Sequence, residues 1–183
     1  TSGGGTGVAN EDGLVVLNVA STNQPVSFDP ADANLVVNEY TEYDCYDTLL
    51  DFNQDGTDVV PALAESWEQV DDLTYTYKIR EGVKFSDGSD LTMDDVLYSL
   101  NRVREDAYGM SYLFEHVDSF EVDEKTRTLT VHLTQPDSTW KYVPATTPCQ
   151  ILKKSVVEAE GDAYGTNEGS VVGLSLIHIS EPT

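Results

Sequence analysis

Carboxylates are the most abundant groups in this chain that could do chemistry. Adjacent pairs occur at Asp71-Asp72 and Asp94-Asp95, and two carboxylates that face one reacting bond can share general acid and base work. The chain holds 33 Asp and Glu residues, so adjacent pairs arise without any functional cause. A surface hydrolase stays open as one alternative, and it would need two carboxylates in one pocket with raised pKa values.

Metal-binding patterns are incomplete. The run from Asp51 to Gly56 resembles the start of an EF-hand calcium loop, but the twelfth position, which needs a bidentate Glu, is Ala62. We therefore expect a hairpin turn there. His116 and His132 have no Cys or His at metal-ligand spacing, so both are expected to face solvent. The sequence predicts no metal site and no cofactor.

Motifs for covalent catalysis are missing from the sequence. It contains no nucleophile elbow, no phosphate-binding glycine loop and no Cys-x-x-Cys, so we predict no catalytic residue and a protein that is not an enzyme. Cys45 and Cys149 are the only cysteines, and we expect two buried thiols that form no disulfide.

The charge balance limits the partners. Ten basic against 33 acidic residues give a formal net charge of −23, which argues against nucleic acid and anionic membranes. No run approaches the ~20 apolar residues that span a bilayer. An acidic interaction module remains a second alternative, and it would show an exposed apolar patch and no cleft.

Tyrosines supply the best candidates for a ligand-facing wall. Trp67, Tyr75 and Tyr77 recur with strand periodicity and are expected in the core, whereas Tyr108 and Tyr112 lie outside any periodic pattern. A tyrosine side chain combines apolar area with a polar tip, which suits a binding surface.

Periodicity predicts helices and hairpins that would position these residues. A Thr92-x-x-Asp95 capping box opens a helix with apolar residues at helical spacing. Residues 50–52 and 58–60 flank an Asp-Gly turn, and residues 117–122 and 127–134 form a second hairpin. The further expected elements are strands at residues 14–20, 73–79 and 149–152 and helices at residues 35–49, 136–142 and from Ser155 onward. This alternation predicts an α+β fold without regular βαβ repetition.

The two ends of the sequence differ in residue pattern from the rest of the chain. Residues 1–13 are small and polar and are expected to form a flexible linker. Residues 174–183 match the in-frame translation of a transposase mosaic-end adapter used for sequencing libraries. We expect this tail to be an artefact of read-through and leave it out of the fold.

Several short motifs together resemble the peptide/nickel family (family 5) of extracytoplasmic solute-binding proteins that serve ABC importers. The motifs are FDP at 28–30, YDTLL at 46–50, PALAESW at 61–67, LTYTY at 73–77, GVKFSDG at 82–88, LTMDDV at 91–96, KSVVE at 154–158 and GTN at 165–167. The resemblance implies an incomplete fold of the type II periplasmic-binding-protein kind. Residues 14–46 and 145–173 would be a partial, α/β-type lobe I, and residues 47–144 a small mixed subdomain of that lobe.

The resemblance also implies a function. Relatives bind a solute between two lobes and deliver it to a membrane permease, which predicts a receptor for oligopeptides or dipeptides; a nickel-chelate, haem or sugar receptor of the same family is the alternative. Ligand contacts are expected from Asn34, Leu35, Val36 and Tyr108, with Tyr112 as the alternative in register. The expected partners are the solute and the transmembrane subunits of an ABC permease. We expect an extracytoplasmic monomer, in the periplasm or on the cell surface, that contacts the membrane only through a lipid anchor on a cysteine that this sequence does not include.

Overall fold

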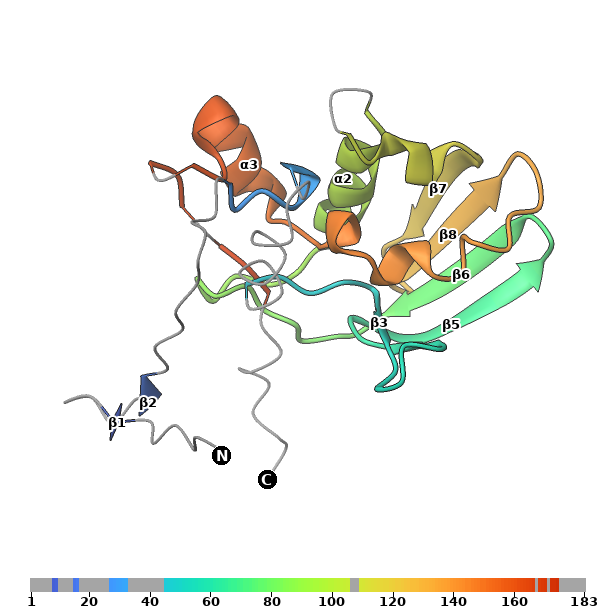
Figure 1. The fold of residues 1–183 in the computed structure, drawn as a ribbon, viewed down its shortest axis with the longest axis horizontal. Coiled ribbons are helices and arrows are strands. Elements are labelled where there is room, and N and C mark those ends of the chain that lie inside the picture. The colour runs from blue at the N-terminus through green and yellow to red at the C-terminus, as the bar shows by residue number, and fades with distance from the viewer. Residues whose placement is uncertain are drawn as a thin grey trace, which may run out of the picture.

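The largest sheet among the described residues is an antiparallel sheet of four strands, seen on the right of Figure 1. The structure is a computed structural model that describes residues 8–9, 15–16, 27–32, 45–105, 109–166, 168–170 and 172–174. The strands are β5 (Ala64–Asp71), β6 (Thr74–Ile79), β7 (Val117–Asp123) and β8 (Thr128–Leu133), in the order β5-β6-β8-β7. The described part of the chain is thus mixed helix and sheet.

Strand periodicity decides which face of the sheet is buried. Alternate residues of the two central strands are buried, as the alternation predicted: Tyr75, Tyr77, Ile79, Leu129, Val131 and Leu133. Leu73, the first residue of the strand expected at residues 73–79, has the same periodicity but is 38% exposed. It lies in the turn before β6, where its amide donates to the carboxylate of Asp71 at 2.8 Å.

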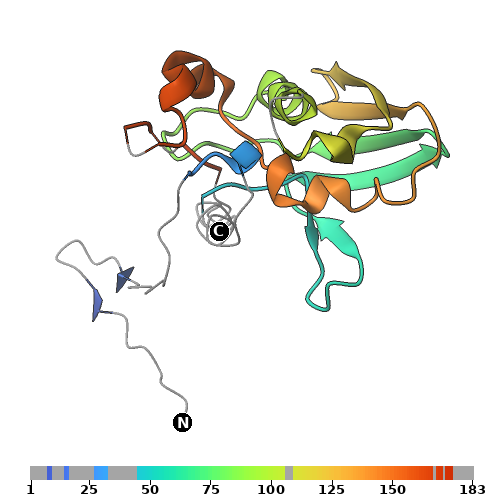
Figure 2. The same ribbon diagram turned by 45° about the horizontal axis from the view of Figure 1, so that its top comes forward.

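Helix α2 (Met93–Arg104) packs on the buried face, as Figure 2 shows. Its N-terminus is the predicted capping box: the amide of Asp95 donates to the Thr92 hydroxyl, and the Thr92 amide donates to the Asp95 carboxylate. The helix buries a row of apolar side chains: Met93, Val96, Leu100 and Val103. The cap, and not only the apolar row, sets where this helix begins.

A separate hairpin joins β3 (Leu50–Phe52) to β4 (Val59–Pro61) and projects from the body in Figure 2. The prediction of a turn here is confirmed. The Asn53 side chain accepts the amides of Thr57 and Asp58 and donates to the Thr57 hydroxyl, and Gly56 has the positive φ of 66° that the turn requires.

Two expected elements are wrong. Residues 136–142 form turns instead of a helix and lead into the short 3-10 helices η3 (Val143–Ala145) and η4 (Thr147–Cys149). The prolines Pro144 and Pro148 lack the amide donors that a longer helix or a strand ladder would use. The expected strand at residues 149–152 is absent as well, and the Ile151 amide makes a single bond to the Asp47 carbonyl.

The expected helix at residues 35–49 lies largely outside the described residues. Its described end, residues 45–49, is not helical. The carbonyls of Thr48 and Leu49 accept the amides of Leu63 and Ala64, so the backbone pairs across the chain and not within a helix.

Short elements complete the described chain. Val15–Val16 (β2) is the described part of the expected strand at residues 14–20, and it pairs with Val8–Ala9 (β1), inside the expected linker. Three further 3-10 helices in the described ranges are η1 (Pro30–Asp32), η2 (Ser111–Phe114) and η5 (Gly161–Ala163), and a further α-helix there is α3 (Lys154–Glu160). Leu174, the first residue of the tail left out of the fold, is only 1% exposed and bridges Phe85. Within the described ranges, no helix is long and apolar enough to cross a bilayer.

Candidate functional site

A buried ion pair joins the start of the chain to the end of α2. The guanidinium of Arg102 donates through both Nη atoms to the two carboxylate oxygens of Asp29, with Nη1 to Oδ1 at 2.6 Å. The side chains are only 10% and 7% exposed. Paired, bidentate geometry of this kind fixes orientation as well as distance, so the loop that carries Asp29 has a defined position on the helix.

Other contacts hold the same loop. The Phe28 amide donates to the Gly165 carbonyl at 2.8 Å, and the Ala31 amide donates to Asp29 Oδ1 at 3.0 Å, which closes η1. Gly165 has φ +78°, and a Cβ at this position would lie 2.6 Å from the Asp29 Cβ. Only glycine fits against the Asp29 loop at this point.

Two tyrosines complete this junction. Tyr164 stacks under the Arg102 guanidinium at 5.7 Å, and its hydroxyl lies 2.9 Å from that of Tyr46. Burial, together with the neighbouring Tyr46, raises the pKa of Tyr164, which keeps the phenol neutral. We call Asp29, Tyr46, Arg102, Tyr164 and Gly165 the junction.

The two segments that were expected to contact ligand adjoin the junction in sequence. Asn34, Leu35 and Val36 follow η1, and Tyr108 follows α2, but all four lie outside the described residues. Both segments start from elements that the Asp29–Arg102 pair holds together.

Tyr112 is the expected ligand residue that the structure does describe. It lies in η2 and is 64% exposed. It lines a surface cavity of about 350 Å³ at the end of α2, together with Arg104, Ser111, Phe114, Glu115 and Val117. The Arg104 guanidinium is held by the Asp118 carbonyl at 2.8 Å. This wall combines aromatic rings with one cation and one anion, groups that can contact a peptide.

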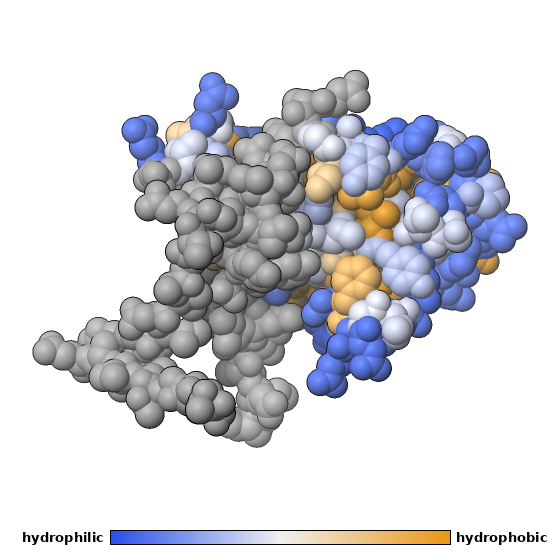
Figure 3. All heavy atoms as spheres, viewed as in Figure 1, coloured by the Kyte–Doolittle hydropathy of each residue, from blue (hydrophilic) through white to orange (hydrophobic). Residues whose placement is uncertain are grey.

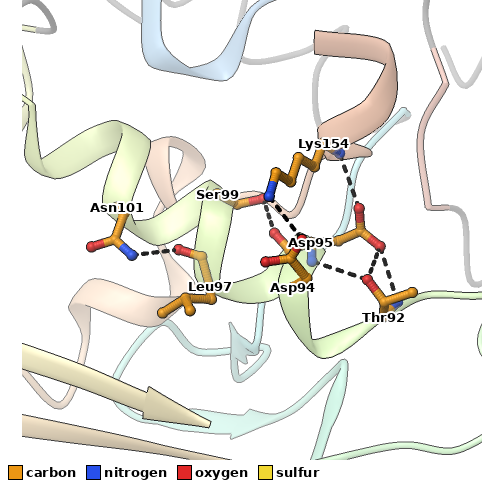
Figure 4. A network of polar contacts seen from close by, with 7 residues as sticks. All are labelled: Thr92, Asp94, Asp95, Leu97, Ser99, Asn101 and Lys154. Carbon is orange, nitrogen blue, oxygen red and sulfur yellow. Dashed lines mark hydrogen bonds and ion pairs between the residues drawn. The ribbon is translucent and has the colours of Figure 1, made fainter. Parts of the chain in front are cut away.

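A second network, which the sequence did not predict, fixes α3 (Figure 4). The helix expected from Ser155 onward is α3, which begins at Lys154, and the side chain of the preceding residue does not cap it. The Lys154 amide instead donates to Asp95 Oδ1 at 3.0 Å, and the Leu152 amide donates to the Ser99 hydroxyl at 2.9 Å. One carboxylate on α2 thus serves the start of both helices.

The described residues form no arrangement that would support metal binding or acid–base catalysis. No group of three or more His, Cys, Asp or Glu side chains could hold a metal ion there. His116 is half-buried, with Nδ1 at 3.0 Å from the Asp137 carboxylate, and His132 lies 3.8 Å from Glu121. The described carboxyl groups with a shifted pKa are all lowered, opposite to a general acid: Asp58, Asp87, Asp123 and Asp137.

Both cysteines lack a disulfide, as expected. Cys149 is buried, which raises the pKa of its thiol to about 12. Cys45 is only half-buried, so the expectation of two buried thiols is confirmed for one of them.

The surface also carries a stacked pair of aromatic side chains. Phe52 and Tyr142, each 36% exposed, have parallel rings 6.4 Å apart, and Lys141 lies 5.4 Å from the Tyr142 ring and pairs with Asp58 at 2.6 Å. On the face in Figure 3, apolar atoms near the centre are bordered by hydrophilic side chains. Lys141 also lies 5.9 Å from the Trp67 ring, so these contacts tie the hairpin to the sheet.

One family model matches more than half of the chain. Residues 58–174 match the model of "Bacterial extracellular solute-binding proteins, family 5 Middle". Heme-binding protein A of Haemophilus influenzae is 40% identical over 90 residues, which are 43% of this chain and 16% of that protein. The HTH-type transcriptional regulator SgrR of Escherichia coli is 30% identical over 109 residues, 60% of this chain and 19% of that protein.

A solved structure extends the similarity to three dimensions. The crystal structure of Haemophilus influenzae OppA in complex with the peptide RPPGFSPFR is 28% identical, with a TM-score of 0.69. The match covers 80% of this chain and 32% of that one. This chain therefore spans about a third of the length of the structure that it matches, and less than a fifth of the two sequence relatives.

Proposed function

Because the chain belongs to the bacterial extracellular solute-binding proteins of family 5, we propose that it forms part of a receptor that captures oligopeptides or dipeptides outside the cell. The receptor would deliver them to the transmembrane subunits of an ABC permease and would have no catalytic activity of its own. Residues 14–46 and 145–173 would contribute to lobe I, and residues 47–144 would be its small subdomain. The receptor would be a monomer, with a lipid anchor as its only contact with the membrane.

The observation that carries this proposal is the junction of Asp29 and Arg102. It holds the loop before Asn34 and the helix before Tyr108 against each other. The proposed ligand contacts are Asn34, Leu35, Val36 and Tyr108, with Tyr112 at the edge. Peptide recognition through such a wall would rest on hydrogen bonds to the ligand backbone, each contributing roughly 0.5–1.5 kcal/mol. Contacts of that kind tolerate many side chains, which suits a receptor for mixed peptides.

A haem receptor is the second candidate, and the 40% identity to Heme-binding protein A favours it. Haem iron usually needs an axial His, Cys, Met or Tyr ligand. Among the residues that line the cavity at the end of α2, Tyr112 could take that role. Both ring nitrogens of the neighbouring His116 already have partners, Nδ1 in Asp137 at 3.0 Å and Nε2 in Gln135 at 2.7 Å. The two candidates therefore use the same surface with different chemistry.

A chimera distinguishes them. In this chimera, residues 27–174 would replace the matching part of Haemophilus influenzae OppA. Calorimetry would measure the binding of the peptide RPPGFSPFR, and absorption spectra would detect the binding of haem. We expect peptide binding, a loss of about tenfold or more for Tyr108→Ala combined with Tyr112→Ala, and no haem spectrum. A folded chimera that binds haem but no peptide would replace the peptide receptor with the haem receptor. A folded chimera that binds neither would refute both.

A further inference from the structure

A second cavity lies at a corner of the sheet, apart from the wall near α2. It has a volume of about 350 Å³ and is lined by Glu65, Arg80, Glu81, Gly82 and Val83. These residues come from the start of β5 and from the turn that follows β6. We call it the corner pocket. None of its residues belongs to the proposed peptide contacts.

Arg80 is held in place but keeps donors available. Its amide donates to the Leu63 carbonyl at 3.0 Å, and its Nε donates to the Ala62 carbonyl at 2.7 Å. Its two Nη groups have no hydrogen bond or ion pair with any described residue, although two glutamates line the same cavity. A guanidinium fixed through Nε presents its remaining N–H groups as a fork that matches a carboxylate.

Glu65 reaches the pocket because of a β-bulge. The register between β5 and β6 passes from Ala64↔Ile79 to Ser66↔Lys78, so Glu65 is the extra residue on β5. A bulge of this kind turns a side chain away from the regular alternation. On the other side, Gly82 has φ +72° and nothing within 4 Å of the position that a Cβ would occupy, which leaves this wall open. Val83 is buried and supplies apolar surface.

The charges of the corner pocket select the ligand. One guanidinium and two carboxylates carry a sum of −1, so a complementary ligand has one carboxylate and two cationic groups. A simple anion would meet the two glutamates and the net charge of −23 of the chain. We propose that the corner pocket binds a free cationic amino acid such as lysine. The α-carboxylate pairs with Arg80, and the ammonium groups pair with Glu65 and Glu81.

An NMR titration of the ¹⁵N-labelled 183-residue chain with L-lysine tests this site. The readout is the change in the amide chemical shifts of residues 81–83. Cadaverine, which lacks the carboxylate, and 6-aminohexanoate, which lacks the α-ammonium, are the comparison ligands. We expect saturable shifts with L-lysine and affinities at least about tenfold weaker for the other two. Equal shifts with cadaverine would show general attraction of cations by the acidic chain and would overturn the proposal, and so would the absence of shifts with L-lysine.

Variants locate the effect. Glu65 and Glu81 are exposed, so Glu65→Gln and Glu81→Gln should leave the fold intact. Each substitution should weaken the binding of L-lysine by about fivefold or more. Glu68→Gln is the matched control, because it removes the same charge from the same strand outside the pocket, and it should leave the affinity unchanged. Arg80→Lys keeps the charge but loses the fork and should weaken binding in a chain whose circular dichroism is unchanged. A loss as large with Glu68→Gln as with Glu65→Gln would overturn the site.

Discussion

At the level of single residues, the pair of Asp29 and Arg102 shows how a local motif acquires a distant role. The motif FDP at residues 28–30 was one of those that carried the family resemblance, and in the structure Pro30 begins η1. The partner of Asp29 could not be predicted, because Arg102 lies 73 positions further along the chain. Helical periodicity placed Arg102 in a helix but gave no reason to bury its charge.

Replacing Arg102 tests this junction. Arg102→Met leaves the Asp29 carboxylate buried without a counter-charge and should lower the free energy of unfolding by about 3 kcal/mol. Urea denaturation followed by circular dichroism measures this loss. The double variant with Asp29→Leu should recover most of it, because the buried charge is then gone. A double variant that is less stable than Arg102→Met would contradict this assignment.

The thiol of Cys149 gives a prediction about reactivity. Burial raises its pKa to about 12, and the thiolate is the reactive form. In the folded chain, raising the pH from 7 to 9 should therefore leave Cys149 unmodified by an aromatic disulfide reagent. The same thiol should react fully in urea. Mass spectrometry of the peptide that contains Cys149 gives the readout, and labelling of the native thiol as fast as in urea would refute the burial.

At the level of helices and strands, elements whose determinants are close in sequence were predicted correctly, and elements that depend on distant residues were not. The capping box of α2 and the hairpins were predictable because their determinants lie within a few residues of one another. The start of α3 was not, because its cap comes from Asp95, 59 positions away. The segment at residues 149–152 looked like a strand by composition, but it follows the proline-containing 3-10 helix η4, and the Ile151 amide makes only one backbone hydrogen bond, to the Asp47 carbonyl, so no strand ladder forms.

Asp95 and its neighbour Asp94 make a matched pair for testing the caps. Asp95→Ala removes acceptors at the start of both helices and should cost about 2 kcal/mol of unfolding free energy. Asp94→Ala removes only an exposed ion pair with Lys154 and should change stability by less than about 0.5 kcal/mol. Thermal and urea unfolding of both variants measure the difference. Equal losses would mean that Asp95 has no special role.

The ion pair of Lys153 and Asp87 predicts a dependence on pH. The hydrogen bond from Lys153, with those from Ser89, lowers the pKa of Asp87. Since the folded pKa lies below the unfolded value, this stabilisation is complete above the ordinary aspartate pKa near 4 and is lost as the pH falls through the folded pKa. Lys153→Met should therefore be less stable than the parent at pH 7, and the gap should narrow below about pH 4. A gap that widens in acid would contradict the pairing.

At the level of the whole molecule, the sheet, α2 and the junction form one scaffold, and the proposed ligand contacts follow η1 and α2 in sequence. The family and the mixed fold could be predicted from the short motifs, since these specify turns, caps and core positions together. Of the five expected ligand contacts, Tyr112 alone lies in the described part of the chain. It is 64% exposed, so a ligand can reach its ring.

The isolated chain gives a prediction about affinity. It spans 32% of the length of the OppA structure that it matches, and a peptide enclosed between two lobes needs contacts from both. Calorimetry of the 183-residue chain with RPPGFSPFR should therefore give a dissociation constant weaker than about 1 µM. A tighter constant would mean that this scaffold binds peptide without a second lobe.

The position of the bound peptide tests the account most directly. A crystal structure of the chimera with RPPGFSPFR would show which atoms of residues 27–174 contact the ligand. We predict peptide backbone within hydrogen-bond distance of residues 34–36 and an aromatic contact from Tyr108 or Tyr112. A peptide that binds the chimera without touching either segment would show that the junction does not position the site.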